Sequence, residues 1–132
     1  LDMTRWPSAK HFVSWLGLSP QNKISGGRVL SSRTRQGTTR AGSAFWMAAV
    51  PLSRTSTALG AFQRRLSARV GKSKALIATA RKLAILYYQT IRYGMEFEEH
   101  GDLAYQQASR ERQIHGLEKR ARALGYQLVA TG

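Results

Sequence analysis

The sequence predicts an all-α fold, a compact bundle of about five helices with a long basic loop after the first helix. Three observations predict it. Apolar residues recur every three or four positions over several stretches, which is the spacing of one helix face. Glycine, proline or serine separates each stretch from the next. No stretch shows the strand–helix–strand pattern of a parallel sheet. The chain has 132 residues, the length of one domain, which is assigned to residues 1–132.

The first helix is predicted to begin after Ser8, which suits the N-cap position, and to stop at Gly17. Residues 21–39 have no periodicity and are rich in Ser, Thr, Gly, Lys and Arg, so they predict an exposed basic loop. A structureless loop of this length in a small domain is usually functional or disordered. The predicted apolar face of the first helix consists of Ala9, Phe12, Val13 and Leu16.

A second helix is predicted over about residues 39–50, where Pro51 ends or kinks it. A third is predicted over about residues 56–70, and Gly71 ends it. The predicted packing faces are Ala41, Ala44 and Ala48 in the second helix and Leu59, Phe62, Leu66 and Val70 in the third.

The longest predicted helix covers residues 74–93, with Ser73 as its cap and Gly94 as its stop. The last helix is predicted over residues 102–125, followed by a short extended tail at 126–129. Its apolar positions are sparse, so it either pairs with a second copy or another domain, or is a solvated surface. The predicted stripe of the longest helix is Leu76, Ala80, Leu83, Tyr87 and Ile91, with Ala84 and Tyr88 beside it.

The net charge of +14 is unevenly distributed along the chain. No Asp or Glu occurs between Asp2 and Glu96, a window that holds 16 of the 21 Lys and Arg residues. Such a surface repels itself and is stabilised by a polyanion that supplies the countercharge. Nucleic acid is the favoured partner, because phosphate neutralisation releases counterions. A merely very soluble domain and a peripheral binder of anionic membranes are the alternatives.

The same window argues against several kinds of site. Two-metal nucleases hold their ions with clustered carboxylates, and residues 3–95 contain none. The chain has no cysteine, and its histidines lack metal-ligand spacing, so surface or capping roles are predicted for them. No signal peptide and no bilayer-spanning stretch is expected. The three histidines are His11, His100 and His115.

Ser25 stands directly before Gly26 and Gly27, among basic residues. Two glycines permit positive φ, which suits a tight turn, and they also let a phosphate lie against backbone N–H groups. A serine hydroxyl placed there could attack phosphorus and form a covalent protein–DNA link. Turn chemistry alone is the other interpretation. The basic residues that would hold the phosphate are Lys23, Arg28, Arg33 and Arg35.

Several short motifs occur together in this chain. They are F-V-S-W-L-G-L-S-P at residues 12–20, S-G-G at 25–27 with the basic stretch after it, A-A at 48–49, and A-T-A-R-K-L-A at 78–84. In this combination they resemble the C-terminal domain of the DEDD-type insertion-sequence transposases, insertion-sequence family one-hundred-ten, related to the pilin-gene invertase. The resemblance runs over about residues 2–129.

The resemblance implies that this chain is a fragment. An N-terminal RNase H-like domain, absent here, would carry four catalytic acids, and Ser25 would act with them in DNA strand cleavage and rejoining. Mg²⁺ is then expected only with that missing domain, and no cofactor is expected in the fragment. The implied partners are DNA, a guide RNA and the missing domain, with a homo-oligomer also considered and no membrane. The expected location is the bacterial cytoplasm, in association with DNA.

The chain departs from the family pattern at two points. Many relatives carry Gly-Asn after the basic loop, whereas Gly37 is followed here by Thr38. Many also carry an arginine in the next helix, where this chain has Trp46. Both departures concern the contacts of the second helix and the activity of this copy, and neither concerns Ser25.

The sequence thus predicts a DNA-facing transposase domain that supplies Ser25 as a nucleophile and, by itself, binds nucleic acid without cutting it. The alternative is a non-catalytic module that packages RNA or DNA, which explains the charge and the helices equally well. The predicted nucleic-acid contacts are Lys23, Arg28, Arg33, Arg35 and Arg40 from the loop and the start of the second helix, and Arg64, Arg65, Arg69, Lys72, Lys74, Arg81 and Lys82 from the third and fourth helices.

Overall fold

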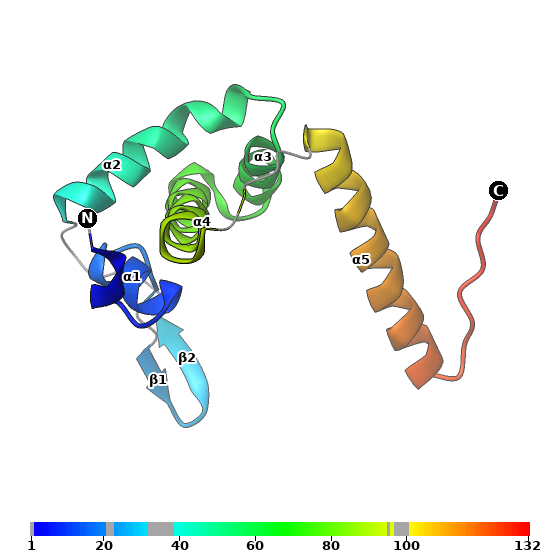
Figure 1. The fold of residues 1–132 in the computed structure, drawn as a ribbon. Helices are drawn as coiled ribbons and strands as arrows, with labels where there is room; N and C mark the ends of the chain where they lie inside the picture. Colours follow the sequence, from blue (N-terminus) through cyan, green and yellow to red (C-terminus); the bar gives the residue numbers. More distant parts are fainter. Residues whose placement is uncertain (1, 21–22, 32–38, 95, 97–100) are drawn as a thin grey trace.

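The computed structural model describes residues 2–20, 23–31, 39–94, 96 and 101–132 (Figure 1). Five α-helices make up most of this part of the chain, which confirms the all-α class. Two short strands also form a hairpin inside the segment that was predicted as a loop. The elements in order are η1 (Met3–Arg5), α1 (Ala9–Trp15), β1 (Lys23–Ser25), β2 (Arg28–Ser31), α2 (Arg40–Ala49), η2 (Val50–Arg54), α3 (Ala58–Val70), α4 (Lys72–Tyr93) and α5 (Gly101–Ala123).

Helix α1 begins and ends where the sequence predicts. The Ser8 hydroxyl accepts a hydrogen bond from the His11 N–H at 3.4 Å and lies 2.7 Å from Nδ1 of the same histidine. His11 therefore has the capping role predicted for it. Gly17, with φ of 79°, carries the chain out of the helix. Phe12 and Leu16 are buried, which confirms the predicted apolar face.

Helix α4 is the centre of the fold, because η1, α1, α2 and α3 all pack against it. The stripe predicted for this helix is only partly right, since Tyr87 is 39% and Ile91 51% exposed. The buried side carries mostly small residues, because neighbouring helices approach the α4 backbone from several sides and leave little room for long side chains. The buried residues of α4 are Ala75, Thr79, Ala80, Ala84 and Tyr88.

The predicted cap of α4 is also wrong. The helix begins at Lys72, directly after Gly71, and no side chain caps it. Gly71 has φ of 95° and is at once the end of α3 and the residue before α4. No linker separates the two helices, so Ser73 falls inside the first turn of α4 instead of ahead of it.

The faces predicted for α2 and α3 also change in detail. Ala44 and Ala48 are exposed, whereas Gly42 and Ala49 are buried. The reason at Gly42 is close packing, because a Cβ at that position would collide with the backbone oxygen of Leu16. In α3 the buried positions are Gly60, Ala61 and Gln63, with Leu59, Phe62 and Leu66 half-buried and Val70 exposed.

An aromatic cluster closes the core where α4 meets the N-terminal segment. The Trp6 and Phe12 ring centroids are 4.9 Å apart, and those of Phe12 and Tyr88 are 5.8 Å apart. The Tyr88 hydroxyl donates a hydrogen bond of 2.6 Å to the backbone oxygen of Trp6. Tyr88 is only 1% exposed, so this bond is shielded from water.

Replacing Tyr88 by Phe is expected to lower the free energy of unfolding by about 1–3 kcal/mol, because the Trp6 oxygen would stay buried without a donor. Urea denaturation followed by circular dichroism measures the loss. Tyr126→Phe is the matched control, since that side chain is 75% exposed, and it should unfold like the wild type. Equal stabilities of the two variants would show that the Tyr88 hydroxyl contributes nothing.

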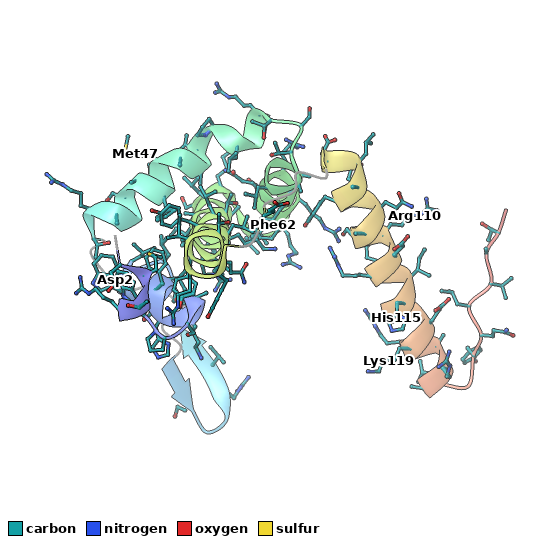
Figure 2. All side chains as sticks on the ribbon, viewed as in Figure 1. Asp2, Met47, Phe62, Arg110, His115 and Lys119 are labelled. Atoms are coloured by element: carbon teal, nitrogen blue, oxygen red, sulfur yellow. The ribbon has the colours of Figure 1, made fainter. Side chains whose placement is uncertain are left out.

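Helix α5 packs mainly against α3 and then extends away from the other helices (Figure 1). Figure 2 shows His115 and Lys119 on the part of α5 that stands apart from them. Apolar residues there are accordingly exposed, Leu117 in α5 at 48% and Leu124, directly after the helix, at 77%. Residues 126–132 are irregular and exposed, so the predicted extended tail forms no strand. Among the described helices, none has the length and apolarity needed to cross a membrane.

Candidate nucleic-acid interface

Ser25 is the last residue of β1, at the tip of a two-stranded antiparallel hairpin. It pairs with Arg28, the first residue of β2, so Gly26 and Gly27 are the two turn residues between them. Their φ values are 57° and 78°. A two-residue turn with positive φ at both positions matches the right-handed twist of the strands and strongly favours glycine. The two glycines are therefore explained by the turn, which fixes the position of the serine.

The tip of the hairpin is exposed in the part of the chain that the structure describes. Ser25, Gly26, Gly27 and Arg28 are exposed, and a Cβ added at either glycine would meet no atom within 4 Å. A large ligand such as a DNA strand can therefore reach the Ser25 hydroxyl and the neighbouring backbone N–H groups. Of the residues that the structure describes, none forms a hydrogen bond with the Ser25 side chain, so no base within them activates it.

The described residues also provide no metal centre near Ser25. Within the described ranges, no group of three or more His, Asp or Glu side chains gathers to hold an ion. Asp2 lies at the N-terminus, where the Thr4 hydroxyl and backbone N–H bond its carboxylate and lower its pKa. These described residues do not fit a Mg²⁺ site.

The basic residues predicted around Ser25 are only partly placed. Arg28 is exposed beside the serine in β2, and Arg40 is exposed at the first position of α2. Lys23 lies in β1 two residues before the serine. Arg33 and Arg35 lie outside the described residues. The structure thus brings Ser25 and Arg28 together and shows Arg40 on a different element.

The predicted helix arginines have different surroundings. The Arg64 guanidinium donates hydrogen bonds to the backbone oxygens of Ser53 at 2.9 Å and Thr55 at 2.7 Å. It also lies 3.4 Å from the Asp102 carboxylate. These contacts tie η2, α3 and the first turn of α5 together, which is a structural function. Arg65, by contrast, is exposed on the same helix.

The remaining predicted cations lie on α3 and α4. Arg69, Lys72, Lys74 and Lys82 are exposed, and Arg81 is half-buried. The Lys82 ammonium lies 4.3 Å from the centroid of the Phe62 ring. Although Lys82 is exposed as a whole residue, desolvation of its ammonium against the Phe62 ring, and then the positive charges of Arg112 and Arg81, lower its pKa. A lowered lysine pKa means that desolvation and the neighbouring positive charges disfavour the charged form.

Sequence reasoning missed the basic residues of α5, because the last quarter of the chain is nearly neutral in total. Arg110 and Arg112 face α3 across two hollows in the surface. A signal was present in the helical spacing. Tyr105, Ser109 and Arg112 recur at intervals of four and three residues, which places them on one face.

Residues 1–64 match the model of the Transposase IS116/IS110/IS902 family. This segment contains α1, the hairpin with Ser25, α2 and the first half of α3. It is the C-terminal domain of such transposases. The family predicted from the sequence motifs is thereby confirmed for residues 1–64. No curated protein and no solved structure matches the chain.

The match ends inside α3, whereas the folded core of this transposase domain does not. Phe12 and Leu16 of the matched segment are packed with Ala80, Ala84 and Tyr88 of α4. Residues 1–64 therefore leave out the central helix that buries their own apolar face. The structural unit of the transposase domain includes α4, whatever the extent of the sequence match.

Proposed function

We propose that this chain is the DNA-facing domain of a transposase and that Ser25 is its nucleophile for strand cleavage and rejoining. Membership of a transposase family implies DNA binding. The observation that supports the nucleophile is the exposed Ser25 at the tip of the β1–β2 hairpin, beside Arg28. That placement presents a hydroxyl, free N–H groups and a positive charge to one phosphate.

The proposed chemistry needs each of these groups. The Ser25 oxygen attacks phosphorus, an O–P bond forms, and the bond from phosphorus to one bridging oxygen of the strand breaks. The serine proton leaves to a base, and the departing oxygen gains a proton and becomes a hydroxyl. Rejoining reverses these steps with the hydroxyl of another strand. Arg28 and the turn N–H groups stabilise the charge that develops on the phosphoryl oxygens.

The base and any Mg²⁺ come from elsewhere in the complete transposase. The partner we propose for this role is an RNase H-like domain, whose clustered carboxylates would hold metal ions and accept the proton. The proposal therefore treats residues 1–132 as one part of a composite active site. A guide RNA remains a proposed further partner, and the packaging module remains the alternative function.

The 132-residue chain is expected to bind duplex DNA with an affinity that falls steeply with salt. If six phosphates are neutralised, the affinity drops about 10³-fold between roughly 50 and 200 mM salt. Fluorescence anisotropy with a labelled duplex measures the slope. Binding that does not change with salt would contradict an interface built on the exposed arginines and lysines.

The proposed nucleophile predicts a covalent protein–DNA product, and the packaging alternative predicts none. In the complete transposase, a nicked DNA substrate that cannot rejoin should trap a protein–DNA adduct that survives denaturation. Mass spectrometry of the digested adduct should place the nucleotide on Ser25. A packaging module would give salt-sensitive binding and no adduct.

A further inference from the structure

Helix α5 is fixed beside α3 by contacts at its first turns. The backbone N–H of Asp102 donates to the backbone oxygen of Ser56 at 3.2 Å, and the Asp102 carboxylate lies 3.4 Å from Arg64. One helical turn later, the rings of Phe62 and Tyr105 meet edge to face, with centroids 6.4 Å apart. Beyond these contacts α5 runs away from α3 (Figure 1).

A groove between α3 and α5, the α3–α5 groove, consists of two neighbouring hollows of about 410 and 370 Å³. They share Arg65, Tyr105 and Gln113, so they are parts of one depression. Arginines come from both walls of the groove. Five arginines line it, Arg64, Arg65 and Arg69 from α3 and Arg110 and Arg112 from α5. Arg64 is engaged with Asp102, which leaves four groove arginines, Arg65, Arg69, Arg110 and Arg112.

The positive charge of the groove has no counterpart in the described protein. Among the described residues, the one ion pair recorded is that of Arg64 with Asp102, so this carboxylate is already engaged. The four groove arginines form no ion pair of their own within that part of the chain. Lys82 adds a fifth cation close by, and desolvation of its ammonium together with Arg112 and Arg81 lowers its pKa. An anion in the groove would relieve this repulsion.

The side chains of the groove select the kind of anion. Arginine presents a planar fork of donors that fits two oxygens of one phosphate. Gln106 and Gln113 add neutral amide donors from α5, and Tyr105 lines both hollows. Arginines on opposite walls suit a strand that carries a phosphate at every nucleotide, since successive phosphates can bind to different arginines.

We propose that the α3–α5 groove is a second binding site for the DNA backbone, separate from the one at Ser25. The inference rests on the proposed DNA-binding function and adds to it. Figure 1 shows the hairpin below α1 and α4, and α5 on another side of the molecule, beside α3. DNA held in the groove is therefore a different segment from the DNA at the serine. The groove positions the duplex and takes no part in the chemistry.

The test replaces one arginine on each wall, Arg65→Gln with Arg112→Gln, in the 132-residue chain. The control pair, Arg54→Gln with Arg122→Gln, removes the same charge from η2 and from the last turn of α5, outside the groove. The probe is a fluorescein-labelled duplex of about 30 base pairs, roughly three helical turns. Anisotropy titrations at several salt concentrations give the affinity and its salt slope, and circular dichroism confirms that each variant is folded.

The groove pair is expected to lower the affinity roughly tenfold per arginine near 0.1 M salt and to reduce the salt slope by about two. The control pair should lose much less. Equal losses of affinity in the two pairs would overturn the site, because DNA would then bind to positive charge spread over the whole surface. An unchanged affinity of the groove pair would overturn it directly. In both cases the wild type still binds DNA, so the proposed function survives. A wild type that does not bind the duplex overturns the proposed function itself.

Two further measurements complete the test. Acetylation of wild-type Lys82, read by mass spectrometry, should fall when the duplex is bound, and unchanged acetylation would contradict the site without any variant. Polyglutamate serves as a competitor that represents acidic polypeptides. If the Arg65→Gln, Arg112→Gln variant binds polyglutamate more weakly than the wild type but binds DNA equally well, the groove is a site for an acidic polypeptide and the proposal is wrong.

Discussion

Replacing Ser25 by alanine in the complete transposase is expected to abolish strand exchange and leave DNA binding nearly unchanged. The loss should be at least about 10³-fold, because removal of an attacking hydroxyl leaves only binding and electrostatic contributions to the rate. Binding should persist because the Gly26–Gly27 turn and Arg28 remain, and because Ser25 is an exposed residue whose hydroxyl forms no hydrogen bond within the described protein. A recombination assay between two plasmids measures exchange, and anisotropy measures binding.

Ser14→Ala is the matched control for this prediction. Ser14 is also exposed, and it lies on α1 away from the hairpin turn, so its loss should leave exchange at the wild-type level. Wild-type recombination by the Ser25 variant would eliminate the nucleophile. If the variant lost DNA binding as well as strand exchange, the serine would be needed to hold the hairpin or the DNA in place. The loss of exchange would then not be evidence for a nucleophile.

Replacing Gly60 by alanine is expected to destabilise the domain by about 3 kcal/mol or more. Gly60 lies in the first turn of α3, and its N–H donates to the hydroxyl of the N-cap residue Thr57 at 3.0 Å. A Cβ there would collide with the backbone oxygen of Leu52 and would lie 2.6 Å from that of Thr55. Backbone atoms cannot rotate aside as a flexible side chain does, so α3 would have to move away from η2.

The neighbouring threonines make that movement costly. The Thr55 hydroxyl donates to the Leu52 oxygen at 2.7 Å and lies 2.7 Å from the Thr57 hydroxyl. A shift of α3 away from η2 disturbs the contact between Thr55 and Thr57, and it also displaces Arg64, which bonds the Thr55 backbone oxygen from the next turn. Since small domains are stable by only about 5–15 kcal/mol, the variant should show a clearly lower midpoint of thermal unfolding.

Gly116→Ala is the control, and it should act in the opposite direction. Gly116 lies inside α5, and a Cβ there would meet no atom within 4 Å. Alanine is favoured over glycine in a helix interior by about 1 kcal/mol, so the helix should become more stable. If both glycine variants unfolded at the wild-type temperature, the close packing of α3 on η2 would be refuted.

The sequence predicts those features of the fold that local signals decide. Ser8 caps α1, and Gly94 stops α4, because each residue satisfies or ends a helix through its own backbone neighbourhood. The stripe of α4 could be predicted only in part. Hydrophobicity predicts that Tyr87 and Ile91 are buried. The packing of several helices against α4 instead buries Thr79 and other small residues. Which residues of a helix are crowded depends on partners that the local pattern does not reveal.

The candidate interface divides in the same way. The exposed turn at Ser25 follows from two adjacent glycines, which are a local signal. The four-arginine groove could not be predicted, because it needs α5 to lie beside α3. The ion pair that fixes this arrangement joins Arg64 to Asp102, which are 38 positions apart in the sequence. Charge averaged over the last quarter of the chain concealed Arg110 and Arg112 among the acids that begin at Glu96.

The bond from Tyr88 to Trp6 spans 82 positions of the chain and has a consequence during synthesis. A ribosome adds about 5–20 residues per second, so Tyr88 is synthesised roughly 4–16 s after Trp6, with which it packs in the folded protein. During that interval the apolar face of α1 has no α4 to pack against and stays exposed. Any transcript truncated before α4 is complete would release a product of that kind, and cellular proteases would be expected to remove it.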